Sequence, residues 1–402
     1  MKNLKVVAVA NHLESSTAYG QQMRMLLEEF PTFEWHYLPL DMRESVQRRM
    51  TFVGSLGQDI TLTTYPTGGD EIHIAENTFT VADTVKPDFV FLYEDVQWLN
   101  EYAKRKSKWP RISWFPWDND NWTPTIEEFM HNADLPVCLS EDTKQLCADH
   151  GFDIDRIYNY VDDASFKPVK KDKVDDFKEK ALGIPADKHV LLYVGRLTAR
   201  KNPEILFAMA RELKKVRQDF VLLIHADAAD PGRTCDPTME VLCHDVADVV
   251  KFSPNIEWSN LPPKEYLNLV YNTADIFVSG HGGEGFGVPA CEAGLCEKPF
   301  IMTDCTTTRE FGGNGIHGFG APIMSSKTVL NIHRPIPDYK KMAELCSIML
   351  DDEMLRFKMG TSFRKWVLEN CRREVVSDQW TKIFEKCLVK KVTVKQHADN
   401  TT

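Results

Sequence analysis

The stretch from Ser279 to Gly294 combines glycines with two carboxylates. It reads SGHGGEGFGVPACEAG, with glycines at 280, 282, 283, 285 and 287. A predicted strand ends at Ser279 and a predicted helix begins at Val288. Glycines leave the backbone N–H groups unhindered, and the amino end of a helix adds a positive dipole. The stretch therefore predicts a site for an anion, most commonly a phosphate.

Two glutamates, Glu284 and Glu292, have seven residues between them. Glu284 lies on the glycine loop and Glu292 lies in the first turns of the following helix. A carboxylate repels a phosphate, so these side chains are expected to bind neutral hydroxyl groups beside it. The hydroxyls of a sugar and of a ribose are the obvious candidates.

Two cations follow another predicted strand, Val190–Val194, in the segment YVGRLTARKNP. Arg196 leaves the end of this strand, and Lys201 comes just before a helix that Asn202 is expected to cap. Both project at the carboxyl edge of a parallel sheet, where open α/β sheets bind ligands. Two such cations can neutralise a diphosphate without a metal, so we expect neither a metal nor a cofactor.

Short apolar runs alternate with helical patterns along the 402 residues. We predict strands at Val6–Ala10, Phe89–Tyr93, Ile112–Phe115, Pro136–Leu139, Val190–Val194, Phe220–Ile224, Asp275–Ser279 and Pro299–Thr303. We predict helices at Ser16–Phe30, Val96–Lys106, Glu141–His150, Glu204–Val216, Pro263–Asn272 and Val288–Cys296, and more between Met342 and Leu388. This alternation indicates parallel sheets in an α/β protein. The charged stretch Phe166–Lys180 is interpreted as a linker, or an exposed helix beside one, between two domains.

The composition narrows the class of function. A net charge of -11 disfavours a general nucleic-acid binder, and no apolar run approaches the roughly 20 residues that span a bilayer. We predict a cytoplasmic protein. The basic run Lys104–Trp109 is either a solvated loop or a weak peripheral contact with an anionic membrane. The histidines show no spacing typical of metal ligands, and His281 is the one beside the glycine loop.

The pairing of G-R-x-x-x-x-K-N-P with G-G-E-G-F-G-x-P-x-x-E-A resembles the retaining glycosyltransferases of family 4, which have the GT-B fold. The resemblance covers roughly residues 1–385 and is strongest after residue 190. It implies two Rossmann-like domains facing each other across a cleft. The acceptor-side domain would comprise residues 1–165 and the donor-binding domain residues 166–374, with a C-terminal helix near 375–390 crossing back to the first domain.

The resemblance also implies roles for the residues named above. Arg196 and Lys201 would clamp the diphosphate of the donor, and Glu292 would bind its ribose. The transferred sugar would contact Glu284 and the backbone of Gly285, Phe286 and Gly287.

Three further positions come from the same resemblance. Gly20, in the first loop of the N-terminal domain, would approach the donor phosphates. A loop near Asn255–Ser259 would receive the nucleobase. Many family members carry a histidine after the fourth N-terminal strand, where this chain has Asp118. Asp118 is therefore the candidate for an acceptor contact. It could equally cap the helix near Thr123–Met130, and Asp118-Asn119-Asp120 is formally a D-x-D metal pattern.

We accordingly expect transfer of a hexose from a UDP- or GDP-sugar to an acceptor hydroxyl of a glycan, glycolipid or glycoprotein. Two other functions are alternatives, although epimerases lack the full two-glutamate pattern. One is a nucleotide-sugar epimerase on the same fold, and the other is a non-catalytic nucleotide-sugar binder.

Overall fold

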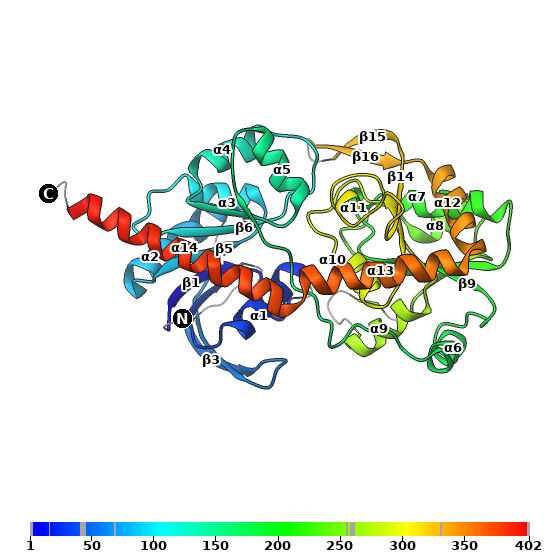
Figure 1. Cartoon of the computed structure of the whole chain (residues 1–402), viewed down its shortest axis with the longest axis horizontal. Coiled ribbons are helices and arrows are strands. Elements are labelled where there is room, and N and C mark those ends of the chain that lie inside the picture. Colours follow the sequence, from blue (N-terminus) through cyan, green and yellow to red (C-terminus); the bar gives the residue numbers. More distant parts are fainter. Residues whose placement is uncertain are drawn as a thin grey trace. The chain divides into compact units, whose positions relative to one another are not determined.

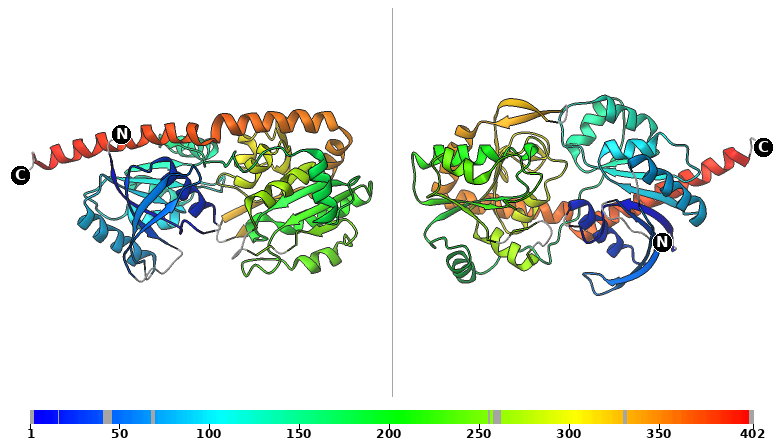
Figure 2. Two further views of the ribbon diagram at one scale, coloured as in Figure 1. Left: turned by 90° about the horizontal axis from the view of Figure 1, so that it is seen from below. Right: turned by 180° about the vertical axis from the view of Figure 1, so that it is seen from behind.

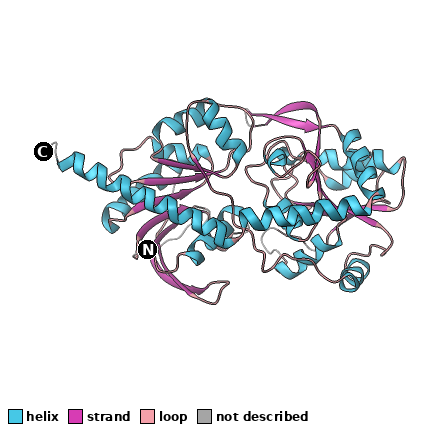
Figure 3. Cartoon of the chain, viewed as in Figure 1, coloured by secondary structure: helices cyan, strands magenta, loops and turns pink. Residues whose placement is uncertain are grey.

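The chain forms two compact units. The computed structural model describes residues 3–15, 17–40, 46–67, 70–254, 256–257, 262–329 and 332–399. Unit 1 comprises Met1–Trp117, Trp122–Tyr160 and Arg373–Thr402, and unit 2 comprises Asp118–Asn121 and Val161–Arg372. Figure 1 labels the elements, and Figure 3 distinguishes helices from strands. None of the described helices is both long and apolar enough to cross a membrane.

Unit 1 is built on an eight-stranded sheet in the order β3-β4-β2-β1-β5-β6-β7-β8. Its strands are β1 (Lys5–Ala10), β2 (Glu34–Pro39), β3 (Arg48–Val53), β4 (Asp59–Thr64), β5 (Phe89–Tyr93), β6 (Arg111–Phe115), β7 (Leu135–Cys138) and β8 (Asp155–Arg156). Among the described strand pairs of this sheet, only the edge pair β3–β4 is antiparallel. Its helices are α1 (Ala18–Glu29), α2 (Glu71–Val85), α3 (Val96–Ala103), α4 (Pro124–Asn132), α5 (Glu141–Asp149) and α14 (Arg373–Asp399). The central strand β5 is apolar and buried along its whole length, as is typical of a parallel sheet with helices on both faces.

The last helix, α14, packs on the sheet of unit 1. Trp380 contacts Phe91 and Trp114, with ring centroids 5.1 Å apart in each pair. Phe384 stacks on Phe89 at 5.2 Å. Three aromatic side chains on neighbouring strands thus hold the C-terminal helix, which contains the segment near 375–390, within the first unit.

Unit 2 contains a six-stranded parallel sheet in the order β11-β10-β9-β12-β13-β14. Its strands are β9 (His189–Val194), β10 (Phe220–His225), β11 (Val250–Phe252), β12 (Ile276–Ser279), β13 (Phe300–Thr303) and β14 (Gly318–Ala321), and a separate antiparallel hairpin joins β15 (Ile323–Val329) to β16 (Ile332–Pro337). Its helices are α6 (Lys171–Lys180), η1 (Ala199–Lys201), α7 (Pro203–Lys214), α8 (Pro237–Cys243), α9 (Lys264–Thr273), α10 (Val288–Leu295), α11 (Thr307–Glu310), α12 (Tyr339–Asp351) and α13 (Glu353–Cys371).

The winding of unit 2 reverses at its centre. From β9 the chain moves outward through α7 to β10, and from β12 it moves the other way through α10 to β13. Right-handed crossovers in opposite directions place α7 and α10 on opposite faces of the sheet. Helix α12 then packs with α7, whereas α13 packs with α10. Figure 2 shows helices on both faces of this sheet. The mixed α/β fold with two Rossmann-like sheets confirms the predicted fold class.

One local feature agrees with the sequence analysis, which offered a linker or an exposed helix beside one, and another was missed. The charged stretch Phe166–Lys180 is an extended segment followed by α6, a regular helix with a mostly exposed surface. The hairpin β15–β16 was not predicted. Most residues of β15 are exposed or half-buried, so its sequence lacks the apolar run used to predict buried strands.

Candidate functional site

The reversal between β9 and β12 brings two loops together in unit 2. These strands are neighbours, with Leu191 opposite Ile276. Their carboxyl ends lead into η1, which ends at Lys201, and into the glycine loop that follows Ser279. Ligands of open α/β sheets bind at such a reversal.

Lys201 and Glu284 are in contact at this point. The Lys201 ammonium donates to Glu284 Oε1, and Arg200 Nη1 lies 3.1 Å from Glu284 Oε2 and 2.6 Å from the carbonyl oxygen of Gly283. The backbone N–H of Glu284 donates to Thr306 Oγ1 at 3.0 Å. Burial opposes ionisation of Glu284, but the charges of Lys201 and Arg200 outweigh it and hold the pKa of this carboxyl well below its ordinary value. Glu284 is therefore ionised.

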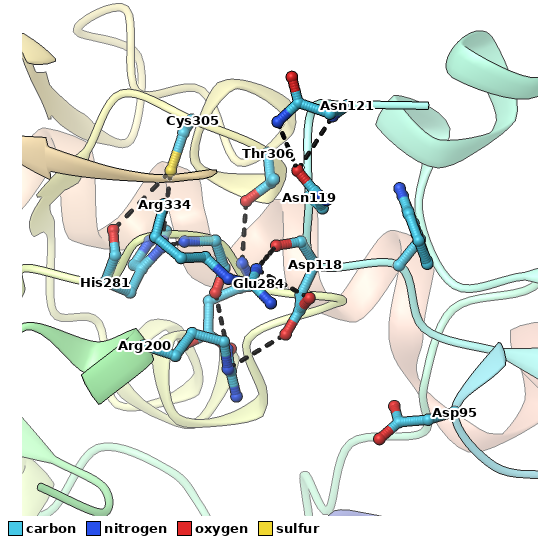
Figure 4. Close-up of polar contacts among 12 residues, drawn as sticks. Asp95, Asp118, Asn119, Asn121, Arg200, His281, Glu284, Cys305, Thr306 and Arg334 are labelled. Carbon is cyan, nitrogen blue, oxygen red and sulfur yellow. Dashed lines mark hydrogen bonds and ion pairs between the residues drawn. The ribbon is translucent and has the colours of Figure 1, made fainter. Parts of the chain in front are cut away.

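Asp118 extends the same network (Figure 4). Its Oδ2 lies 3.1 Å from Arg200 Nε, and its Oδ1 lies 2.9 Å from Arg334 Nη1. Arg334 Nη1 also donates to the backbone carbonyl of Asp118. The side chains thus alternate in charge from Arg334 through Asp118, Arg200 and Glu284 to Lys201. Asp118 was expected in the N-terminal domain, but the contacts of Asp118–Asn121 place this segment in unit 2.

Close backbone packing supports this network. Gly283 has φ +128°, and a Cβ there would clash with the carbonyl oxygen of Asp118. Asn202 precedes α7 as predicted, yet its side chain does not cap the helix. It instead donates to the carbonyl oxygens of Gly280 at 2.7 Å and Pro335 at 3.0 Å. Asn202 therefore ties β16 to the start of the glycine loop.

Arg196 lies outside this network. Its Nε and Nη2 donate to the two carboxylate oxygens of Asp230 at 2.6 and 2.7 Å, and the Asp230 side chain is buried. The hydrogen bonds that Arg196 donates to Asp230 raise the pKa of the Arg196 guanidinium. About half of the Arg196 side chain remains exposed, at 51%. Asp230 thus fixes a partly exposed guanidinium beyond the carboxyl end of β9.

The glycine loop ends at the amino terminus of α10. Gly287 is the N-cap residue and has φ +95°, a conformation that favours glycine. Gly285 and Phe286 are buried, and the Phe286 ring packs edge-on against Phe311 at 5.7 Å. A pocket at this end of the helix is lined by Val194, Lys201, Phe277, Ser279, His281, Glu284, Gly287, Pro289, Ala290, Met302, Thr307 and Phe311. The helix terminus and the lysine therefore line one pocket.

Glu292 has a different environment from Glu284. Its Oε2 accepts a hydrogen bond from Tyr271 Oη at 2.7 Å. Burial raises the pKa of Glu292 to about 7, and the bond from Tyr271 only partly offsets this. The two glutamates of the sequence pattern therefore differ, since the neighbouring cations favour the ionised form of Glu284 and burial favours the protonated form of Glu292.

His281 is held inside the glycine loop by hydrogen bonds. It is buried, its Nδ1 accepts a hydrogen bond from the N–H of Gly283 at 3.2 Å, and its Nε2 lies 3.1 Å from Thr308 Oγ1. Burial lowers the pKa of His281 to about 4. The imidazole is therefore neutral and helps to shape the loop.

The two carboxylates of the D-x-D pattern, Asp118 and Asp120, pair with different arginines. Asp118 binds Arg200 and Arg334, whereas Asp120 Oδ2 lies 3.2 Å from Arg309 Nη2. In the part of the chain that the structure describes, no group of three or more His, Cys, Asp or Glu side chains is arranged to hold a metal ion.

The remaining predicted positions do not belong to this network. Gly20 is in the first turn of α1 in unit 1, where its N–H donates to Thr17 Oγ1 at 3.3 Å. Within Asn255–Ser259, only residues 256 and 257 belong to the described residues, so the predicted nucleobase loop lies largely outside them. In the basic run, Lys104, Arg105 and Lys108 form ion pairs with Glu128, Glu76 and Asp83. These pairs reduce the positive charge available to an anionic membrane.

Sequence reasoning missed four side chains of this region: Arg200, Asp230, Tyr271 and Arg334. Arg200 was visible beside Lys201, and its proximity to a strand end was a usable signal. The other three approach from distant segments and carry no local pattern.

Solved structures share this architecture. Sucrose-phosphate synthase from Thermosynechococcus elongatus aligns with a TM-score of 0.73 at 15% identity, covering 96% of this chain and 100% of that one. HepE from Anabaena in complex with UDP-glucose aligns with a TM-score of 0.71 at 12% identity, covering 96% and 100%. The fold of this chain is the GT-B fold of glycosyltransferases.

Sequence comparison agrees with the fold. The profile of the family described as Glycosyl transferases group 1 matches residues 174–330, which lie in unit 2. The D-inositol 3-phosphate glycosyltransferase of Thermomonospora curvata is 28% identical over 188 residues, 44% of this chain and 42% of that protein. The enzyme of the same name from Mycolicibacterium smegmatis is 29% identical over 181 residues, 44% and 38%. The alignments thus span less than half of these relatives. These matches support the interpretation of this chain as a GT-B glycosyltransferase.

Proposed function

We propose that this protein is a retaining glycosyltransferase that moves a hexose from a UDP- or GDP-sugar to an acceptor hydroxyl of a glycan, glycolipid or glycoprotein. The observation that carries the proposal is the contact of Lys201 with Glu284 beside the amino end of α10, with Glu292 about one turn into the same helix. The pocket at the start of α10 thus offers Lys201 and the helix dipole to a diphosphate and the Glu284 carboxylate to hydroxyl groups, and Glu292 offers a second carboxylate further along the helix.

Each group has a proposed role. Lys201 and the amino end of α10 bind the diphosphate. The partly exposed Arg196, which lies beyond the carboxyl end of β9, also binds it. Glu284 and the backbone from Gly285 to Gly287 hold the transferred sugar. Glu292 accepts hydrogen bonds from the ribose hydroxyls, with Tyr271 fixing its position.

The proposed reaction needs no protein nucleophile. The bond between the anomeric carbon and the diphosphate oxygen breaks, and the acceptor oxygen bonds to the same face of that carbon. The acceptor proton passes to the departing phosphate oxygen. Cations around the diphosphate stabilise the developing negative charge, and positioning of the two substrates supplies the rest of the acceleration.

We propose that the donor site works without a divalent metal. Three cationic side chains, Arg196, Arg200 and Lys201, follow β9, and the carboxylates of the D-x-D pattern are engaged by arginines. UDP-glucose is the first donor to test, because HepE was solved with it.

A panel of UDP- and GDP-sugars, assayed with and without acceptor glycans, tests the proposal. Transfer requires that nucleotide release depends on the acceptor and that the product keeps the donor's anomeric configuration. Conversion of the nucleotide sugar without acceptor would indicate an epimerase. Tight binding of nucleotide sugars with no turnover would indicate a non-catalytic binder.

A further inference from the structure

The alternating charge network described above ends at Arg334, which comes from the unpredicted hairpin. Arg334 is buried, with 8% of its side chain exposed, so it is poorly placed to touch a ligand directly. Its contacts are instead with Asp118, through the carboxylate at 2.9 Å and through the backbone carbonyl. Any effect of Arg334 on a ligand must therefore act through Asp118.

Asp118 passes this constraint to Arg200. Asp118 Oδ2 lies 3.1 Å from Arg200 Nε, and Arg200 Nη1 reaches both Glu284 Oε2 and the Gly283 carbonyl oxygen. A guanidinium has a rigid, planar set of donors, so fixing Nε fixes the direction of Nη1. Figure 4 shows Arg334, Asp118, Arg200 and Glu284 in sequence.

The network matters most when a donor binds. The proposed function requires Lys201 to turn toward the diphosphate, which takes one cation from Glu284. Arg200 then remains as the cation beside this carboxylate, and a buried carboxylate without a partner is costly. A misplacement of about 1 Å in a sugar-binding group can cost roughly a hundred-fold in rate.

We propose that Arg334 is a positioning residue that, through Asp118 and Arg200, holds Glu284 against the transferred sugar while Lys201 binds the donor diphosphate. The inference rests on the proposed function. It assigns a role to the hairpin β15–β16, namely to deliver one buried cation to the donor site. It also assigns Asp118 to the donor side of the reaction, in place of the acceptor contact that the resemblance implied.

The test compares Arg334→Gln and Arg334→Lys with wild type in transfer assays, with nucleotide diphosphate affinity measured by calorimetry. We expect Arg334→Gln to lower kcat by about ten- to a hundred-fold and to change the affinity for free UDP or GDP by less than about three-fold. Arg334→Lys keeps a cation beside Asp118 and should recover part of the lost kcat. Lys327→Gln is the matched control, since Lys327 lies on the same hairpin and binds Glu204 at 2.8 Å; it should transfer like wild type.

A double-mutant cycle separates this role from simple folding of the hairpin. If Arg334 acts through Asp118, Arg334→Gln should have little further effect on kcat in the Asp118→Asn background. Full additivity of the two losses in kcat would overturn the inference. So would a kcat of Arg334→Gln equal to that of an active wild-type enzyme. If Arg334→Gln fails to fold, Arg334→Lys and Asp118→Asn still decide the question, because both must then lower kcat without loss of nucleotide affinity. A wild-type protein without transfer activity would overturn the proposed function and this inference together.

Discussion

Lys201 and Glu284 form an ion pair although 83 positions separate them in the chain. The contact joins the loop after β9 to the loop after β12, so the two halves of the sequence pattern meet at one place. It also means that the lysine proposed to bind the diphosphate is partly neutralised before the donor arrives. We can therefore predict whether a substitution of Lys201 or Glu284 raises or lowers the affinity for a nucleotide.

Glu284→Ala should separate nucleotide binding from turnover. Its removal leaves Lys201 and Arg200 without this carboxylate, so affinity for a free nucleotide diphosphate should stay constant or rise. Turnover should fall by about a hundred-fold, because the contact to the sugar tightens as the glycosidic bond breaks. Calorimetry with UDP and GDP, beside transfer rates, checks both parts. A large loss of free-nucleotide affinity would show that Glu284 serves the nucleotide.

Glu292→Ala should weaken the free nucleotide and the nucleotide sugar alike. Loss of a hydrogen bond to a charged acceptor costs about 1.5–3 kcal/mol, or roughly ten- to a hundred-fold in affinity. Tyr271→Phe is the matched variant, because it removes the hydroxyl that holds Glu292 and leaves the carboxylate in place. It should give a smaller loss in the same direction. Unequal effects on the two ligands would contradict a role at the ribose.

The same glutamate should make stability depend on pH. Burial raises the pKa of Glu292 from 4.5 to about 7, so the folded protein holds this proton more tightly than the unfolded chain. The contribution of this group to the free energy of unfolding therefore falls as pH rises from about 4.5 to about 7. The variant Glu292→Gln cannot ionise at this position, so its free energy of unfolding lacks this pH-dependent contribution. Urea titrations at several pH values should show its stability gaining on wild type across that window, whereas parallel curves would contradict the assignment.

Much of the fold could be predicted because its signal is local. The strand Phe89–Tyr93 is a five-residue apolar run, and the helix beginning at Val288 follows glycines and contains Pro289 near its start. The hairpin β15–β16 gave no such signal, since its side chains are mostly exposed or half-buried. Local patterns specify elements that bury an apolar face, and they say little about elements held by polar contacts.

The site was predictable to the extent that its residues lie at strand ends. Glu284 and Lys201 follow predicted strands, so their meeting could be anticipated. The partners Asp230 and Arg334 could not, because an ion pair depends on two side chains arriving from unrelated segments. Asn202 shows the same limit: its position before α7 predicted a cap, yet its amide binds two carbonyl groups from elsewhere.

Transfer should persist without divalent metal. We expect EDTA to leave the rate within about two-fold of the untreated enzyme, because arginine and lysine side chains supply the charge that a metal would. Rates measured after EDTA treatment and after addition of magnesium or manganese test this. Activity abolished by EDTA and restored by manganese would instead make Asp118 or Asp120 a metal ligand.

Trp380→Ala should strongly destabilise unit 1. The side chain is fully buried against Phe91 and Trp114, and truncation of a buried aromatic residue costs about 3–5 kcal/mol. Trp380→Phe should cost much less, since the indole N–H has no partner among the described residues. Lys382→Ala, at an exposed position of the same helix, is the control. Urea unfolding followed by circular dichroism gives the free energies.

The assignment of Asp118–Asn121 to unit 2 bears on how this protein can be dissected. A recombinant fragment of Val161–Arg372 would contain most of unit 2 but would lack the carboxylate that Arg200 and Arg334 share. Such a truncation would leave two guanidinium groups to repel each other. Grafting the tetrapeptide onto the fragment through a short linker, or supplying it as a synthetic peptide, would restore the missing piece. Unit 2 is in this sense a split domain, whose smallest fragment is four residues long.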